Sequence, residues 1–287
     1  MSRQVNSALV RTKASPEWLM LGELVFIGLG LHDEYGMSLR GRSEAKSCVH
    51  LFAEFYTSVM PGLNLENLKK IVGKPVQVLS RFEVEERAEQ VILLKAKVGK
   101  VGFLVQGDPM VATTHVDLRL RAHKAGIRTS VIHAASVGSA AAGVTGLQSY
   151  KFGRTATIPA SWQGEFPESV YLAIKRNLSS GLHSLVLLEV DVENKRHIGI
   201  PEGLKQLLAV SKRKSETAIV PETLVVGIAR LEAPDMHVKA GTVSELIQID
   251  FGEPPYAIIF PGRLHFVEAE ALELFCGARK ELVAGKA

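Results

Sequence analysis

Short apolar runs alternate with amphipathic stretches through the first half of the chain, and this alternation restricts the possible folds more than any other feature. The apolar runs predict strands at 24–30, 50–56, 76–80, 101–109 and 128–134. The stretches between them predict helices at 38–48, 65–73, 83–97 and 111–126. Strands that alternate with helices of about 10–15 residues are typical of a mostly parallel sheet with helices on its faces. The first half is therefore expected to be an α/β domain.

The second half has a different character. Residues 135–146 are rich in small side chains, which would let two elements approach closely, and we place the region between two domains there. The strands predicted beyond it are longer and richer in β-branched residues, at 183–192, 223–231 and 256–262. Helices are predicted at 168–181, 200–214 and 264–278.

A chain of 287 residues is long enough for two domains. The predicted fold class is α/β, with an N-terminal extension over 1–23, an N-terminal α/β domain over 24–135 that holds two glycine turns, and a C-terminal α/β domain over 136–287. The extension shows no periodicity, and Met20 is an alternative start.

The composition excludes several classes of protein. The charged fraction is 22% and no polar tract is long, so the chain as a whole is not disordered. The two cysteines, Cys48 and Cys276, cannot build a disulfide framework or a cysteine-based zinc finger, and they fit a reducing cytoplasm. A net charge of +4 is mild for a nucleic-acid binder and suits an acidic partner equally well.

The N-terminal region resembles a secretory signal peptide at first reading. Residues 18–31 are almost all apolar, and Arg3, Arg11 and Lys13 precede them. Glu23 interrupts the run, however, and its second half reads better as a buried strand that enters a glycine turn. No other stretch approaches the roughly 18–20 apolar residues of a membrane span. We therefore expect neither a signal peptide nor a membrane anchor.

The first glycine turn, Gly28-Leu29-Gly30, follows a predicted strand, where backbone amides can approach a nucleotide. With Glu54 further along, it resembles the start of a dinucleotide fingerprint, but Asp33 stands where the third glycine is required. The Asp33 carboxylate would also oppose a bound pyrophosphate. A nicotinamide oxidoreductase is therefore disfavoured, and a tight turn without a ligand stays open as an alternative.

The second glycine turn is Gly107-Asp108-Pro109, which lies between a predicted strand and a predicted helix. Ligands of open α/β sheets bind at this end of a strand. The Asp108 carboxylate could accept hydrogen bonds from a ligand amine, from a ribose hydroxyl or from the amides of its own loop. Taken alone, Gly-Asp-Pro is ordinary turn chemistry.

Five segments stand in one order and at compatible spacings: FIGLGLHDE (26–34), FAEFYTS (52–58), GDPMVATTH (107–115), HAASVGSAAAGVTGLQSYKFG (133–153) and FGEPPYAIIFPGRLHFVEAE (251–270). Together they resemble the diphthine synthases, a family of S-adenosylmethionine-dependent methyltransferases within the tetrapyrrole-methylase-like group. The segment GDPMVATTH discriminates, because tetrapyrrole methylases share its Gly-Asp-Pro but usually continue with a different helix start. The chain departs from the family at Val105-Gln106, where Thr-Pro is more frequent, and at Tyr256, where His is frequent.

The resemblance implies successive methylation, by S-adenosylmethionine, of an amine on translation elongation factor 2. The acceptor is the 3-carboxy-3-aminopropyl group of a modified histidine, and the product is diphthine. The resemblance further implies a cytoplasmic homodimer with the cofactor in a cleft between the two domains. Neither a metal nor a catalytic triad is expected. Two alternatives stay open: a methylase of a tetrapyrrole or corrinoid precursor on the same scaffold, and a nonenzymatic nucleotide-binding module.

By motif position, the resemblance places the cofactor against Leu31, Asp108, Val111, Ser136, Val137, Leu188, Ala229 and Tyr256. Several of these are apolar, because backbone amides and carbonyls can bind the cofactor while side chains give the pocket its shape. Core packing is the alternative role for Val111, Leu188 and Ala229. Candidates on the acceptor side are Tyr56, His115 and Lys151. No residue is assigned to take the proton of the amine.

Overall fold

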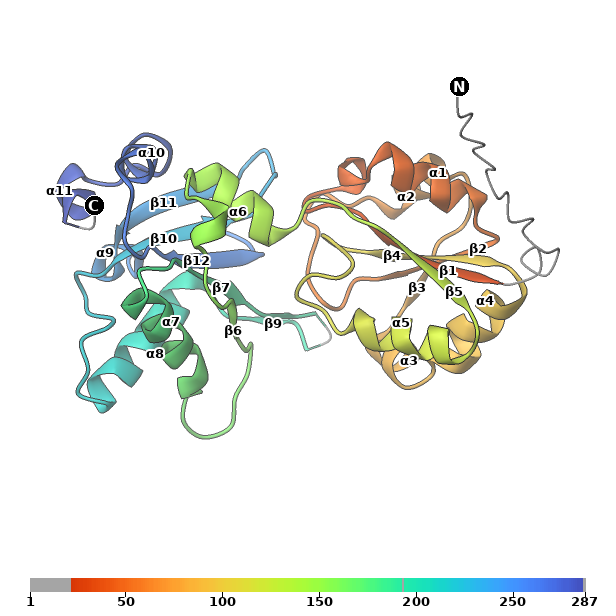
Figure 1. Ribbon diagram of the computed structural model, residues 1–287, viewed down its shortest axis with the longest axis horizontal. Coiled ribbons are helices and arrows are strands. Elements are labelled where there is room, and N and C mark those ends of the chain that lie inside the picture. Colours follow the sequence, from red (N-terminus) through yellow and green to blue (C-terminus); the bar gives the residue numbers. More distant parts are fainter. Residues whose placement is uncertain (1–21, 193, 286–287) are drawn as a thin grey trace, which may run out of the picture.

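The computed structural model describes residues 22–192 and 194–285, and it consists of two five-stranded sheets, each flanked by helices (Figure 1). Almost all of the expected N-terminal extension, with Met20, lies outside the described residues, as does the start of the apolar run at 18–31. Within the described residues, none of the helices is both long enough and apolar enough to cross a membrane.

The first sheet is entirely parallel, in the order β3-β2-β4-β1-β5. Its strands are β1 (Glu23–Gly28), β2 (His50–Glu54), β3 (Gln77–Leu79), β4 (Lys100–Val105) and β5 (Arg128–Ile132). The central strands β1 and β4 are buried along almost their whole length, because helices cover both faces of a parallel sheet. The parallel α/β arrangement expected for the first half is confirmed.

Helices cover the two faces of this sheet unequally (Figure 1). One face carries α1 (Leu39–Ser47) and α2 (Leu65–Val72), and the other carries α3 (Arg81–Glu85), α4 (Leu94–Val98) and α5 (His115–Lys124). The single helix predicted over 83–97 is interrupted, since a turn of π-helix, η3 (Glu89–Leu93), lies between α3 and α4.

The second sheet is mostly antiparallel, in the order β11-β10-β12-β7-β6, and only β6 and β7 run parallel. Its strands are β6 (Ala156–Ile158), β7 (Ser184–Leu188), β10 (Leu224–Ala229), β11 (His237–Thr242) and β12 (Tyr256–Phe260). A short hairpin of β8 (Val190–Asp191) and β9 (Arg196–His197) follows β7. Strands β6 and β11 have no counterpart among the predicted strands.

The helices of the second half also lie on both faces of their sheet (Figure 1). The helices α7 (Glu168–Ser179) and α8 (Ile200–Arg213) pack on one face, and α6 (Val137–Thr145) and α10 (Phe266–Cys276) pack on the other. Shorter elements are η2 (Glu34–Gly36), η4 (Ser149–Lys151), α9 (Val243–Leu246) and α11 (Lys280–Ala284).

Helix α6 lies in the segment of small residues, where the sequence pattern predicts the region between the two domains. Ser136 caps it, in a reciprocal arrangement with Ser139, and Gly146 ends it with φ +71°. A Cβ at Gly146 would lie 2.4 Å from the Cβ of Ala271, so only glycine lets this turn sit against α10. A domain boundary at 135/136 would fall just before α6, and we retain it as a proposal.

Candidate active site

A cavity of about 410 Å³ lies where the carboxyl ends of the first sheet's strands face the second sheet. The first half contributes residues 30–31, 56–60, 81, 85, 105–108 and 111–114 to its lining. Residues 136–137, 157, 187–190, 228, 231 and 255–257 complete it. The volume is within the range of about 300–1,000 Å³ that is usual for sites of small ligands.

The strand order explains why a cavity forms at this edge. Strands β1 and β4 are neighbours, but the chain leaves β1 towards β2 on one side and leaves β4 towards β5 on the other. The helices that follow these two strands therefore lie on opposite faces of the sheet, and open α/β sheets bind ligands outside the carboxyl ends of the strands at such a point.

Two glycines tie these loops together by their backbones. The Gly107 N–H donates to the Gly30 carbonyl (2.7 Å), and the Gly30 N–H donates back to the Gly107 carbonyl (3.3 Å). Both have positive φ, +82° at Gly30 and +61° at Gly107, which other residues adopt only with strain. The two glycine turns of the sequence therefore form one rigid floor at the crevice.

Asp108 organises its own loop. Its Oδ1 accepts a hydrogen bond from the Met110 N–H (3.0 Å), and its Oδ2 lies 2.7 Å from Nδ1 of the exposed His133. Only 7% of Asp108 is exposed. The structure therefore contains the hydrogen bond from a loop amide that the sequence suggested for this carboxylate. It also shows the contact with His133, a residue that the sequence analysis does not single out.

Most of the predicted cofactor contacts lie together around the cavity. Its lining includes Leu31, Asp108, Val111, Ser136, Val137, Leu188 and Tyr256, and also Tyr56 from the acceptor-side candidates. Ala229 is fully buried in β10 and lies outside the lining, although its neighbour Ile228 belongs to it. That these residues bind a cofactor stays a prediction.

Tyr56 and Tyr256 stand on opposite sides of the cavity. The Arg81 guanidinium lies over the Tyr56 ring, 5.2 Å from its centroid, and Arg81 is the cation among the described lining residues. The Tyr256 hydroxyl donates a hydrogen bond to the Gly252 carbonyl, which ties this side chain to the loop before β12.

His115 does not reach the cavity. Its imidazole is 1% exposed and packs edge-on against Phe103, with 5.2 Å between ring centroids. Burial lowers the pKa of His115 to about 4, so the ring is neutral at neutral pH. The direct contact with an acceptor, for which His115 is a candidate, is not available to this side chain in the described structure.

Glu54 is a functional candidate that the sequence analysis names only with the incomplete dinucleotide-binding pattern at the first glycine turn. Its carboxylate is fully buried at the end of β2, where Oε1 accepts from the Thr57 hydroxyl (2.6 Å) and Oε2 accepts from the N–H groups of Tyr56 (3.1 Å) and Thr57 (3.2 Å). Burial raises the pKa of Glu54, although these hydrogen bonds act in the opposite direction. The visible signal was a carboxylate within the apolar run FAEFY.

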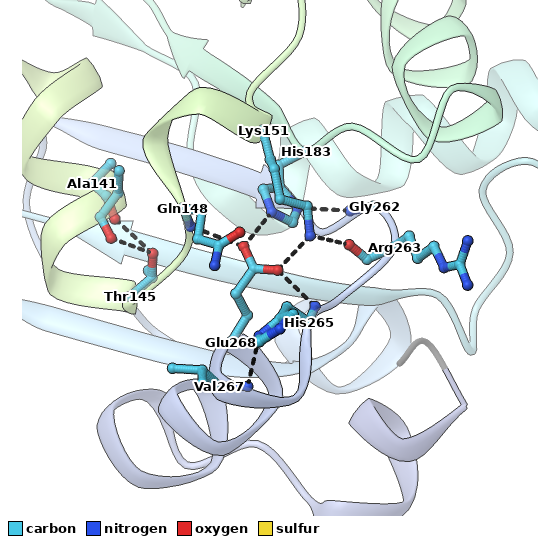
Figure 2. A network of polar contacts seen from close by, with 11 residues as sticks. Ala141, Thr145, Gln148, Lys151, His183, Gly262, Arg263, His265, Val267 and Glu268 are labelled. Atoms are coloured by element: carbon cyan, nitrogen blue, oxygen red, sulfur yellow. Dashed lines mark hydrogen bonds and ion pairs between the residues drawn. The ribbon is translucent and has the colours of Figure 1, made fainter.

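Lys151 lies in a separate polar network in the second half (Figure 2). Its ammonium donates to the Arg263 carbonyl (2.6 Å) and to Glu268, and His183 Nε2 lies 2.9 Å from the same carboxylate. Lys151 is absent from the cavity lining. The structure therefore gives this residue a role in joining η4 to α10, and it does not bring it to the acceptor-side candidate Tyr56.

Two buried oxygens at the cavity have no hydrogen-bond partner among the described residues: Gln106 Oε1 and Thr113 Oγ1. Buried polar atoms are nearly always bonded in folded proteins, so an unpaired pair beside a cavity indicates a polar ligand. The described residues contain no group of His, Cys, Asp or Glu side chains that could hold a metal ion.

Comparison with known proteins agrees with this geometry. Residues 23–247 match the family described as Tetrapyrrole (Corrin/Porphyrin) Methylases. The chain is 44% identical over 256 residues to the diphthine synthase of Methanocella arvoryzae, covering 89% of this chain and 99% of that protein. It is 45% identical to the diphthine synthase of Methanocaldococcus jannaschii over 255 residues, 88% of this chain and 98% of the relative.

Solved structures give the same result. A crystal structure of diphthine synthase superposes with a TM-score of 0.82 at 33% identity, covering 91% of this chain and 99% of the other. The structure of a putative diphthine synthase from Entamoeba histolytica gives 0.80 at 34% identity, covering 90% and 99%. The chain therefore belongs to the diphthine synthase family of tetrapyrrole methylases.

Proposed function

We propose that this S-adenosylmethionine-dependent methyltransferase methylates the amine of the 3-carboxy-3-aminopropyl group on a histidine of translation elongation factor 2. Repeated methylation of this amine would give diphthine, an intermediate in diphthamide biosynthesis. The observation that carries the proposal is the cavity between the two sheets, whose lining contains seven of the eight predicted cofactor contacts. The rival assignment to a tetrapyrrole or corrinoid precursor rests on the shared scaffold alone.

The cavity fits the methyl donor that the family implies. Gln106 Oε1 and Thr113 Oγ1 would accept hydrogen bonds from its amino groups, which would satisfy both unpaired oxygens. Above Gly107 the nearest atoms to an added Cβ are 3.8 Å away, so a ligand can approach the backbone there. Leu31, Val111 and Leu188 would enclose the apolar parts of the donor.

The remaining lining fits the acceptor. The acceptor group carries a carboxylate next to its amine, and Arg81 supplies a guanidinium at the cavity for that carboxylate. Tyr56 stacks under Arg81 and keeps the guanidinium in place. When bound, S-adenosylmethionine supplies a methyl group on a positively charged sulfur. The residues of the cavity align the amine with that methyl group and keep water out, and alignment supplies most of the catalysis.

We further propose that the protein acts in the cytoplasm as a homodimer. Both cysteines are buried and free, which suits a reducing compartment. Helix α10 exposes large apolar side chains, with Phe266 69% exposed, Leu274 71% and Phe275 62%. Large apolar side chains exposed on one helix are typical of protein–protein contacts, and a second copy of the chain would cover them. Sedimentation equilibrium would test this, since a monomer at micromolar concentration would contradict it.

The test of the function uses elongation factor 2 whose histidine carries the carboxyaminopropyl group. The protein is incubated with this substrate and S-adenosylmethionine, and the histidine peptide is analysed by mass spectrometry. We expect successive gains of methyl mass. Binding of S-adenosylmethionine without any gain of methyl mass would contradict the diphthine assignment. The protein would then be a methylase of another substrate. Absence of binding would favour a nonenzymatic module instead.

A further inference from the structure

A buried polar cluster lies directly behind one wall of the cavity. Glu54, at the end of β2, and His115, at the start of α5, are 0% and 1% exposed. Thr57 links this cluster to the cavity. It belongs to the cavity lining, and its hydroxyl donates a hydrogen bond to Glu54 Oε1 (2.6 Å). Thr57 is therefore the lining residue that is bonded to a carboxylate outside the lining.

The hydrogen bonds of His115 fix which of its ring nitrogens carries the proton. Nδ1 lies 3.3 Å from the Pro109 carbonyl, and a carbonyl can only accept, so Nδ1 holds the hydrogen. Nε2 is then an acceptor, and it lies 3.7 Å from Glu54 Oε1 with no hydrogen-bond partner among the described residues. Nε2 cannot form a hydrogen bond with an ionised Glu54, because both groups are acceptors. A protonated Glu54 carboxyl group would donate a hydrogen bond to it.

The charged groups around Glu54 are few. Arg81 from α3 acts on it at a distance, and His115 from α5 is kept neutral by burial. Glu85, also on α3, acts on His115 and favours its charged form only weakly against that burial. Burial is the largest influence on Glu54 and raises its pKa, which brings the carboxylate closer to the pH at which a base is most effective.

We propose that Thr57 and Glu54 form a proton relay that deprotonates the acceptor amine before each methyl transfer, with His115 Nε2 accepting the hydrogen bond of the protonated carboxyl. This inference rests on the proposed function. An N–H bond of the acceptor ammonium breaks as its proton bonds to the Thr57 oxygen, and the former Thr57 proton bonds to Glu54 Oε1. The nitrogen keeps the electron pair and becomes the nucleophile. Between turnovers the proton returns by the same two bonds to water that enters the cavity.

The proposal gives Thr57 the catalytic contact and makes Glu54 a group that acts through it. The test is the single-turnover rate of the first methyl transfer, measured as a function of pH. Thr57→Val and Glu54→Gln should both slow the transfer about 100-fold at pH 7. Their rates should rise with pH, because the amine then loses its proton without help. Thr57→Ser keeps the hydroxyl and should restore most of the rate.

A matched control comes from Glu34, a second buried glutamate that accepts a backbone hydrogen bond, from the Asn64 N–H at 2.9 Å, and lies outside the cavity lining. Glu34→Gln should keep the wild-type pH profile. Calorimetry should give the same affinity for S-adenosylmethionine in Glu54→Gln as in the wild type. A Thr57→Val protein with the wild-type rate and profile would overturn the relay. So would a Glu54→Gln protein that loses donor affinity in step with its rate.

A second readout needs neither donor nor acceptor. The infrared difference between wild type and Glu54→Gln isolates the carboxyl stretch of Glu54, which we expect to titrate above the ordinary range of a glutamate. Titration within or below that range would overturn the relay. If the wild type transfers no methyl group at all, the proposed function fails, and this titration still decides whether Glu54 is built to hold a proton.

Discussion

Two fully buried glutamates, one in each half of the molecule, have opposite surroundings. Glu268 on α10 is bonded to the Lys151 ammonium, to His183 and to the backbone N–H groups of Gln148 and His265 (Figure 2). Glu54 on β2 accepts only from neutral donors, and no cation is hydrogen-bonded to it in the described part of the chain. Burial would raise both pKa values, but the bonds to Glu268 lower its pKa to about 2, whereas the pKa of Glu54 stays raised.

The histidines beside the two carboxylates show the same contrast. His183 Nδ1 accepts a hydrogen bond from the Gly262 N–H (3.0 Å), so its Nε2 carries the hydrogen and donates to Glu268 (2.9 Å). His115 has the other tautomer, and its Nε2 presents a lone pair to Glu54. At the first site the histidine donates to a carboxylate, whereas at the second it presents an acceptor that a protonated carboxyl group would satisfy. The difference is the cation: a buried glutamate bonded to an ammonium group is held ionised, and we expect one bonded only to neutral donors to be able to take up a proton.

The largest expected effect comes from breaking the structural site. Glu268→Ala removes the carboxylate that is paired with the Lys151 ammonium and leaves two backbone N–H groups without an acceptor, so the free energy of unfolding should fall by about 3–5 kcal/mol. Urea denaturation followed by circular dichroism measures this. Glu270→Ala, an exposed position on the same helix, is the control and should stay within about 0.5 kcal/mol of wild type. A loss below about 1 kcal/mol at Glu268 would remove the contrast between the sites.

A smaller effect should appear in the acid sensitivity of the other site. The folded pKa of His115, about 4, lies below its ordinary 6.5, so its contribution to stability is present above pH 6.5 and is lost as the pH falls towards 4. Between pH 7 and pH 5 the wild type should lose about 2 kcal/mol through this group. His115→Asn should lack that part of the loss in urea titrations at the two pH values. Equal losses in variant and wild type would show that His115 is not kept neutral.

The smallest of these effects concerns the cavity floor. Asp108→Ala removes the acceptor for the Met110 N–H and the contact with His133, so the loop after β4 should loosen and affinity for S-adenosylmethionine should fall about 10-fold. Calorimetric titration measures the dissociation constant. The control is Asp117→Ala, which removes an exposed carboxylate on α5 outside the cavity and should leave the dissociation constant unchanged. An unaltered constant in Asp108→Ala would limit the role of this residue to its own turn.

Much of the fold could be predicted from the sequence because its signals are local. Alternation of apolar runs and helical patterns identified every strand of the first sheet, and positive-φ glycines such as Gly73 end helices where expected. Helix α6 was missed because residues 135–146 have too few large apolar side chains to show a helical period. Strand β11 was missed because its sequence HVKAGT gains strand structure by pairing with β10.

The position of the site in the fold could be predicted from the sequence, but many of its side-chain contacts could not. Loops that follow neighbouring parallel strands must meet at one edge, so Leu31, Asp108 and Val111 converge as the motifs suggested. Spacing along the chain does not reveal which way a side chain points, and His115 therefore turned out to face the core. The role suggested for Glu54 depends on burial by β4, α3 and α5, which only the tertiary structure supplies.

The rate of the first methyl transfer, measured at pH 7 on folded Glu54→Gln and Glu268→Gln proteins side by side, tests most directly whether one buried carboxylate serves the reaction and the other the fold. We predict that Glu54→Gln is slowed about 100-fold and that Glu268→Gln stays within about twofold of wild type. Equal rates in the two variants, or a slower Glu268→Gln, would contradict the account.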